Sequence, residues 1–403
     1  PELLYPESRD HMLNVLLTVE GGGFRKHAPR TLGTIPETEN HILMTEGSKY
    51  LKNRWLAFHG NTSEDYDNIK NGLEARLFLF LTNMKTKGLF EFNSMPYSGY
   101  TIMALLNLEA FGSQAISELS RDVLDHIAYT YAAGSFDHKY FPPMRRQLKK
   151  AFWYELTTHY ETAIMKTWLS YLPSFEDAHI TNGAHHDLLA AVLPYRPSDD
   201  VIKLIKNDTA GYFLKIGHGR RAGPEIYDRG EEYLLSGGGM HRGRISMIVS
   251  RPICLFLKDS AEHLNETFHL YGPGDNFKRW NNTGVYHKFA CAAGYVHIPD
   301  HAILLADNEI WKIYKGGRDL LIAVHSSEDA GIIALFEDNE PEELLSVITQ
   351  YNNDPEILKH SFQFPEGSKI DYDLNSHNNK WVIKSINLEP VNRDFDLWPL
   401  VNF

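Results

Sequence analysis

The spacing of apolar residues changes once along this chain of 403 residues, near Gly211. Before that point apolar residues recur every three or four positions over long segments, which is the spacing of amphipathic helices. After it they alternate or form short runs between Gly, Pro, Asn and Asp, as in antiparallel strands. Helices followed by strands, without βαβ alternation, argue against a Rossmann or TIM-barrel arrangement. The pattern predicts a helical domain over residues 1–208 and an antiparallel β-sheet domain over residues 209–403.

The predicted helices are long and are joined by loops that contain Gly, Pro and polar residues. They cover residues 39–56, 63–84, 117–133, 143–172, 184–193 and 198–205, and another begins near Pro96. The predicted strands cover 212–216, 233–235, 244–249, 253–257, 302–305, 309–314, 320–325, 332–336, 369–374 and 380–387, with one helix at 341–351. Helical hairpins in series are typical of an α/α toroid or solenoid. We therefore expect a multidomain α+β protein, with an α/α toroid-like domain before an antiparallel β-sandwich-like domain.

Composition excludes several classes of partner. Lys and Arg number 40 against 52 Asp and Glu, so the net charge of −12 repels a phosphate backbone, and nucleic acid is a poor candidate partner. Apolar runs fall far short of the roughly 20 residues that span a bilayer, so we expect no membrane span. The chain opens at Pro1, which suggests processing, and we expect a secreted or periplasmic protein. Cys254 and Cys291 either form one bridge or remain free thiols.

Two polar clusters stand at predicted helix starts. They are Glu39-Asn40-His41 and Glu91-Phe92-Asn93-Ser94, the second followed by Tyr97. In a ring of helical hairpins such starts lie at one rim and can face a common cleft, so these side chains are candidates for catalysis and binding. A structural interpretation competes with this one, because Glu in a first turn favours the helix dipole and Asn or Ser caps a helix.

Three further clusters lie later in the chain. His185 follows Thr181-Asn182-Gly183, Tyr227 belongs to Glu225-Ile226-Tyr227, and His241 and Arg242 follow the glycines of Ser236-Gly237-Gly238-Gly239. The glycine run lacks the Lys-Ser/Thr of a P-loop, so we expect a tight loop and no nucleotide. Neither H-x-x-x-H nor H-E-x-x-H occurs, and no G-x-S-x-G elbow is present. We expect no metal and no cofactor.

The order of helical hairpins and then antiparallel sheet resembles the polysaccharide lyases built from an α/α toroid and a β-sandwich, such as heparinase-like, alginate and chondroitin lyases. The segments Glu39-Asn40-His41, Glu91-Phe92-Asn93-Ser94 and Asn282-Thr283-Gly284-Val285 are also similar to those of bacterial secreted proteins with this layout. In the lyases an Asn or His neutralises the uronate carboxylate, and a Tyr or His handles protons. The resemblance implies these roles for residues of matching type: Asn93, His41, His185, Tyr97 and Tyr227.

The sequence thus predicts a polysaccharide lyase that cleaves a uronic-acid glycan by β-elimination, with a polysaccharide or oligosaccharide as its substrate. Catalytic candidates are Asn93, Tyr97, His41, Glu91 and Tyr227, and substrate-binding candidates are Asn40, His185, His241 and Arg242. We place the site between the two halves, since ligand sites favour domain junctions. Two alternatives remain open: a glycoside hydrolase that uses Glu39 and Glu91, and a glycan-binding protein without catalysis.

Overall fold

The computed structural model describes residues 4–18, 23, 25–29, 32–33, 36–91, 93–94, 97–136, 139–140, 160–170, 187–206, 211–216, 224–238, 252–258, 263–270, 281–377, 380–398 and 401–402. Helices occupy the described chain up to Lys206, and antiparallel strands dominate from Gly211 onwards. The protein is therefore a mixed α+β chain in which the helices precede the sheets.

The helical half consists of helices that mostly follow the predicted segments. These are α1 (Pro6–Thr18), α2 (Glu39–Ile42), the π-helix η1 (Leu43–Gly47), α3 (Ser48–Phe58), the 3₁₀ turn η2 (Glu64–Tyr66), α4 (Leu73–Lys87), α5 (Ser98–Phe111), α6 (Gln114–Gly134), α8 (Tyr160–Leu169), α9 (Asp187–Val192) and α10 (Asp199–Lys206). A short hairpin of β1 (Ser135–Phe136) and β2 (Lys139–Tyr140) follows α6 directly.

Two helices differ from their prediction for local backbone reasons. The predicted helix over 39–56 is present but contains the π-helical turn η1, and such single turns inside helices are frequent at functional sites. The predicted helix over 63–84 begins only at Leu73, because Gly72 before it has a φ of 73°, a left-handed conformation that suits glycine. Part of the predicted helix over 143–172 lies outside the described residues, and α8 forms its end.

The described residues of the second half form three antiparallel sheets. The seven-stranded sheet has the order β10-β7-β6-β5-β4-β3-β19, the six-stranded sheet β11-β12-β13-β14-β9-β8, and the four-stranded sheet β15-β16-β17-β18. Their bounds are β3 (Gly211–Ile216), β4 (Pro224–Arg229), β5 (Tyr233–Gly238), β6 (Ile253–Leu257), β7 (Phe268–Leu270), β8 (Val285–Tyr286), β9 (Phe289–Ala292), β10 (Val296–His297), β11 (Leu304–Asp307), β12 (Lys312–Lys315), β13 (Leu320–Ser326), β14 (Gly331–Glu337), β15 (Ser361–Gln363), β16 (Lys369–Tyr372), β17 (Ile383–Ile386), β18 (Glu389–Pro390) and β19 (Val401–Asn402). Short 3₁₀ turns also occur at Leu264–Glu266, Ile357–Lys359 and Phe395–Leu397.

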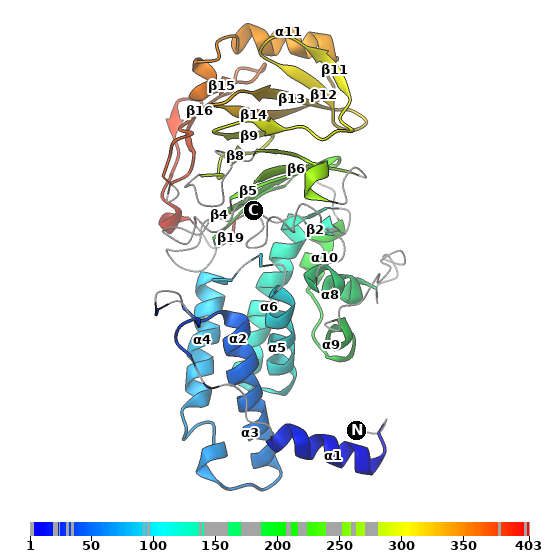
Figure 1. Ribbon diagram of the computed structural model, residues 1–403, viewed down its shortest axis with the longest axis vertical. Helices are drawn as coiled ribbons and strands as arrows, with labels where there is room; N and C mark the ends of the chain where they lie inside the picture. The colour runs from blue at the N-terminus through cyan, green and yellow to red at the C-terminus, as the bar shows by residue number, and fades with distance from the viewer. Residues whose placement is uncertain are drawn as a thin grey trace.

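The elements stack in layers along the long axis of the molecule. Figure 1 shows the helical half below the seven-stranded sheet, the six-stranded sheet above that, and α11 (Pro341–Tyr351) across the top. One hydrophobic core is made by side chains from the stacked sheets and α11, and a separate one lies among the helices. Each half therefore buries apolar surface of its own, which is the property of a domain.

The glycine run of the second half corrects one sequence expectation. Ser236 and Gly237 belong to β5 and pair with Tyr227 and Ile226 of β4, so the first part of the run is strand and not a tight loop. A Cβ on Gly237 would lie 2.6 Å from Cγ2 of Val285 in the facing sheet. Glycine is needed here because the two sheets approach closely.

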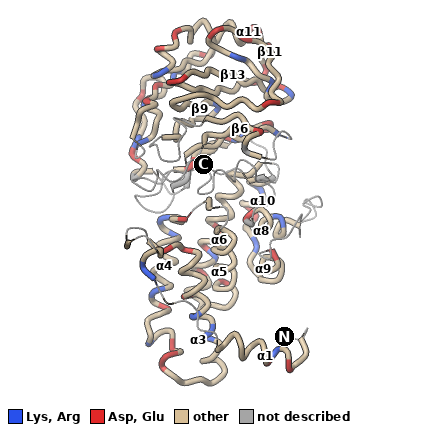
Figure 2. The backbone as a smooth tube through the Cα atoms, in the orientation of Figure 1, with Lys and Arg blue, Asp and Glu red and all other residues tan. Residues whose placement is uncertain are grey.

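The structure also bears on the two cysteines, on the distribution of charged residues and on the expectation that no segment spans a membrane. Cys254 and Cys291 are buried free thiols, which settles the question of a bridge between them. Acidic and basic residues are interspersed along both halves (Figure 2). Among the described helices, none combines the length and the hydropathy that a membrane-spanning segment requires.

Candidate active site

The two halves meet where the end of α6 and the β1-β2 hairpin contact β4. Side chains alternate along β4, so Glu225, Tyr227 and Arg229 share one face of the strand. Nη1 of Arg229 donates to the carbonyl oxygens of Ala132 and Ser135 at 3.1 and 3.4 Å, and its Nη2 donates to Leu204 O at 2.6 Å. This buried guanidinium thus ties the ends of α6 and α10 to the sheet.

Beside Arg229, a buried hydrogen-bond network links the segment before α5 to the same strand. Nδ2 of Asn93 donates to Oε1 of Glu225 at 2.6 Å, and the hydroxyl of Tyr227 donates to Oε2 at 2.9 Å. The hydroxyl of Tyr140 donates to Oδ1 of Asn93 at 3.1 Å. The amide of Asn93 and the phenol of Tyr227 therefore both bond one carboxylate, and the phenol of Tyr140 bonds that amide. Asn93 and Tyr227 are predicted site residues.

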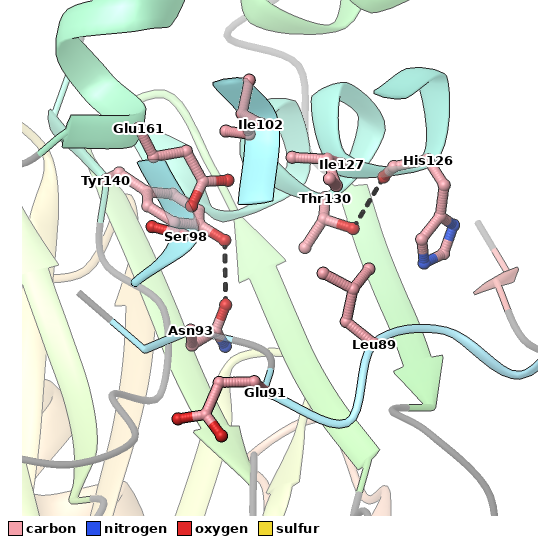
Figure 3. Close-up of a pocket in the computed structure, with 10 residues that line it drawn as sticks. All are labelled: Leu89, Glu91, Asn93, Ser98, Ile102, His126, Ile127, Thr130, Tyr140 and Glu161. Atoms are coloured by element: carbon pink, nitrogen blue, oxygen red, sulfur yellow. Dashed lines mark hydrogen bonds between the residues drawn. The ribbon is translucent and has the colours of Figure 1, made fainter. Parts of the chain in front are cut away.

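A small cavity of about 30 Å³ lies beside this network, which is enough to hold water. Its wall contains the following residues: Leu89, Glu91, Asn93, Ser98, Ile102, His126, Ile127, Thr130, Tyr140 and Glu161. Figure 3 shows the side chains of Tyr140 and Asn93 pointing toward one another at one side of this space, with Glu161 close to Tyr140. The wall combines apolar side chains with the polar groups of Glu91, Asn93, Tyr140 and Glu161, so the junction holds a small and only partly polar cavity.

The electrostatic environment keeps the phenols of this network protonated. Burial raises the pKa of Tyr140 well above its ordinary value, and the nearby charge of Glu161 raises it further. Burial also raises the pKa of Tyr227 well above its ordinary value, followed by the charge and the hydrogen bond of Glu225. Both hydroxyls are therefore hydrogen-bond donors at neutral pH and not proton acceptors.

Asn93 has an unusual backbone conformation. Its φ is 48°, in the left-handed region that non-glycine residues seldom adopt and that Asn tolerates better than most. The side-chain bonds to Glu225 and Tyr140 hold it there. Strained residues that the surroundings hold in place are concentrated at functional sites.

Glu39 attaches the start of α2 to this segment. Its Oε1 accepts the backbone N–H of Phe90 at 2.5 Å, and its Oε2 accepts that of Glu91 at 3.0 Å. The carboxyl group is buried, and burial raises its pKa to about 7, with the charge of Glu91 adding to the shift. Glu39 therefore positions the backbone of Phe90 and Glu91, and it is only partly ionised at neutral pH.

The raised pKa of Glu39 predicts a pH-dependent contribution to stability. Between the ordinary value of 4.5 and about 7, the folded protein binds the Glu39 proton more tightly than the unfolded chain does. The contribution is greatest below pH 4.5 and is lost as the pH rises toward 7, with a total on the order of 3 kcal/mol. In Glu39→Gln this loss is absent, so the melting temperature of the variant should improve relative to wild type between pH 5 and 7.5. If calorimetry shows that the melting temperatures of the two proteins change by the same amount across this pH range, the assignment is contradicted.

The start of α2 carries buried polar atoms without hydrogen-bond partners. Oδ1 of Asn40 is buried and lacks one, as does the hydroxyl of Ser94. Nδ1 of His41 is also buried, and the group that faces it is the carboxylate of Glu37, 3.3 Å away. The side chain of Thr38, the N-cap residue of α2, makes no capping bond. Buried polar atoms are nearly always paired, so a group of unpaired ones calls for a functional explanation. Asn40 and His41 are thus not explained as helix caps.

Of the remaining predicted site residues, two lie in the described part of the chain and three lie outside it. Glu91 is buried in the cavity wall, and Tyr97 is half-buried at the N-cap of α5. His185, His241 and Arg242 lie outside the described residues, so those three remain predictions. The structure thus brings Glu91 and Asn93 to one cavity, connects Asn93 to Tyr227 through Glu225, and connects α2 to both through Glu39.

Sequence reasoning missed four residues of this region: Glu37, Tyr140, Glu161 and Glu225. A signal for Glu225 was available, because it stands two positions from Tyr227 in a predicted sheet region and must share its face. Tyr140 and Glu161 had no such signal, since only the tertiary fold brings them to Asn93. Glu37 precedes the predicted helix and lies outside its apolar pattern.

No set of three or more His, Cys, Asp or Glu side chains suited to a metal ion occurs in the part of the chain that the structure describes. Comparison with protein-family models, with curated proteins and with solved structures found no match. The function must therefore be inferred from the site itself.

Proposed function

We propose that this protein is a polysaccharide lyase that cleaves a uronic-acid-containing glycan by β-elimination. In this proposal the helical hairpins form a toroid-like cleft and the stacked sheets form a β-sandwich. The substrate lies at the junction, over the start of α2 and the 91–94 segment. No metal or cofactor takes part, and a secreted or periplasmic location would give access to polymeric glycans.

The observation that carries the proposal is a set of polar side chains at the start of α2 and before α5. The buried Oδ1 of Asn40 and the buried hydroxyl of Ser94 lack hydrogen-bond partners, and the His41 side chain is 36% exposed. The imidazole of His41 and the hydroxyl of Ser94 can donate hydrogen bonds to a carboxylate without bringing a negative charge of their own, whereas Oδ1 of Asn40 is an acceptor that suits a sugar hydroxyl. A lyase needs such donors, because the proton next to a carboxylate is removed only when the charge of that carboxylate is offset. The amide of Asn93 is already engaged by Glu225 and Tyr140, so in this proposal it holds the site in place.

The reaction requires two proton transfers. A base removes the proton from C5 of the uronate, the electron pair becomes the C4–C5 double bond, and the C4–O4 bond breaks. An acid then gives a proton to O4. His41 and Tyr97 are the candidates for these steps, since the phenols of Tyr140 and Tyr227 are buried and serve as donors that hold Asn93 and Glu225.

The proposal predicts ultraviolet absorbance from an unsaturated uronate when the protein digests one polymer of a panel of alginate, heparan, chondroitin, hyaluronan and pectin. Tyr97→Phe and His41→Gln should each lower kcat by roughly 10²- to 10⁴-fold, the usual contribution of general acid–base catalysis. Tyr66→Phe is the matched control, because its half-buried phenol belongs to η2 and lines no part of the cavity. A flat trace on every polymer would remove the lyase proposal.

A glycoside hydrolase is the second candidate, and the carboxylates of Glu91 and Glu161 in one cavity wall favour it. The Glu39 and Glu91 pair suits it less well, since both oxygens of Glu39 accept backbone N–H groups. Reducing ends released without ultraviolet absorbance, and abolished in both Glu91→Gln and Glu161→Gln, would establish a hydrolase. Glycan binding in calorimetry without any turnover would instead indicate a binding protein.

A further inference from the structure

Glu37 lies one helical turn before His41 and faces it. The distance from Oε2 of Glu37 to Nδ1 of His41 is 3.3 Å. The Glu37 side chain is 5% exposed and the His41 side chain 36%, while Nδ1 of His41 is itself buried. The exposed part of the His41 side chain therefore lies away from Nδ1. The arrangement is that of a buried carboxylate behind a histidine whose outer edge faces solvent.

The position of Glu37 is fixed by its neighbours. Its backbone N–H donates to Lys26 O at 3.1 Å, next to the isolated bridge between His27 and Pro36. Its second carboxylate oxygen, Oε1, accepts the backbone N–H of Thr38 at 3.1 Å. Oε2 is thereby directed at His41 and has no hydrogen-bond partner elsewhere among the described residues.

We infer that Glu37 is a positioning residue that holds His41 in the tautomer with the proton on Nδ1. A carboxylate beside Nδ1 interacts favourably only when that nitrogen carries a proton, and a neutral imidazole has only one. Nε2 is then unprotonated and directed outward. Carboxylates and carbonyls that fix the orientation of a functional histidine in this way are a common feature of active sites.

The catalytic consequence rests on the proposed function. With Nε2 unprotonated, His41 is the group that accepts the C5 proton of the uronate. The imidazolium that forms then donates from Nδ1 to the Glu37 carboxylate. Tyr97 supplies the proton to O4 as the C4–O4 bond breaks, and it recovers a proton from solvent, to which His41 releases its own. The inference thus assigns the role of base to His41 and the role of acid to Tyr97, which the sequence did not distinguish.

The tautomer can be measured without any substrate. In the full chain with ¹⁵N-labelled histidine at about pH 8.5, well above the ordinary imidazole pKa, the Nε2 resonance of His41 should be that of an unprotonated nitrogen. Loss of the signal in His41→Gln assigns it. Glu37→Ala should shift the equilibrium toward the Nε2–H tautomer, whereas Glu37→Gln, which keeps an acceptor oxygen, should retain the wild-type spectrum.

Glu46→Ala is the matched control, because it removes a buried carboxylate of the π-helix η1 that pairs with Arg76, and it should leave the His41 tautomer unchanged. A wild-type His41 with its proton on Nε2, or an unchanged tautomer in Glu37→Ala, would overturn the inference.

The role of Glu37 in the reaction is tested separately, by the kinetics of Glu37→Ala. On a cleaved polymer, Glu37→Ala should lower kcat by roughly 10- to 100-fold, a fraction of what a general base supplies, with KM changed much less. An altered tautomer with full kcat would refute the role in the reaction. If no polymer is cleaved, the proposed function fails, while the tautomer measurement still decides whether Glu37 positions His41.

Discussion

Arg229→Met should destabilise the protein by about 3 to 5 kcal/mol and lower the melting temperature by roughly 10 °C. The guanidinium donates to carbonyl oxygens at the ends of α6 and α10, and it lies buried at the junction. Met fills similar volume but donates no hydrogen bond, so the carbonyls of Ala132, Ser135 and Leu204 lose a charged donor in a place that water reaches poorly.

Calorimetry and urea unfolding measure the effect. Lys288→Met is the matched control, since it removes a cation whose pair with Glu337 is about 40% exposed and should cost less than about 1 kcal/mol. Equal, small losses in both variants would show that Arg229 does not join the two halves.

Asn93→Asp should produce the largest effect within the candidate site. The substitution keeps the shape of the side chain but replaces the NH₂ donor with a carboxylate oxygen 2.6 Å from Oε1 of Glu225. Two buried carboxylates at this distance cannot both ionise, so one of them takes up a proton and its pKa rises. We expect a loss of roughly 3 to 5 kcal/mol at pH 8.

The sign of the pH dependence follows from that raised pKa. The folded variant binds a proton that the unfolded chain has released, so its stability should recover as the pH falls from 8 to 5. Asn61→Asp adds the same charge at an exposed turn and keeps the acceptor oxygen for the N–H of Ser63, so its stability should stay near that of wild type. An Asn93→Asp variant with no such recovery at low pH would show that Asn93 and Glu225 are not paired in solution.

The helices and strands were predictable wherever local pattern decides them. The apolar spacing around the helix Pro341–Tyr351 and the strands Leu320–Ser326 and Gly331–Glu337 is enough to place these elements. The late start of α4 was not predictable from spacing, because the left-handed φ of Gly72 interrupts an otherwise helical pattern.

The candidate site was predictable only in part, for a physical reason. Asn93, His41 and Glu91 stand at helix starts, and that position is visible in a sequence. Their partners Glu225 and Tyr140 are set by how the sheet meets the helices, and the distances of 132 and 47 residues that separate them from Asn93 leave no local trace. The contact between Glu37 and His41 is local, but a helix pattern does not reveal that the carboxylate is buried.

The alternation of side chains along β4 limits how this protein can be recombined. One face of the strand supplies Glu225, Tyr227 and Arg229 to the helical half, so the sheet half provides a share of the polar groups that surround Asn93. A chimera that grafts the helices onto a foreign sheet would separate Asn93 from its carboxylate even if both pieces folded. A chimera must therefore take the helices and β4 from the same protein. A fusion point placed where the helices end and the strands begin would separate Asn93 from Glu225.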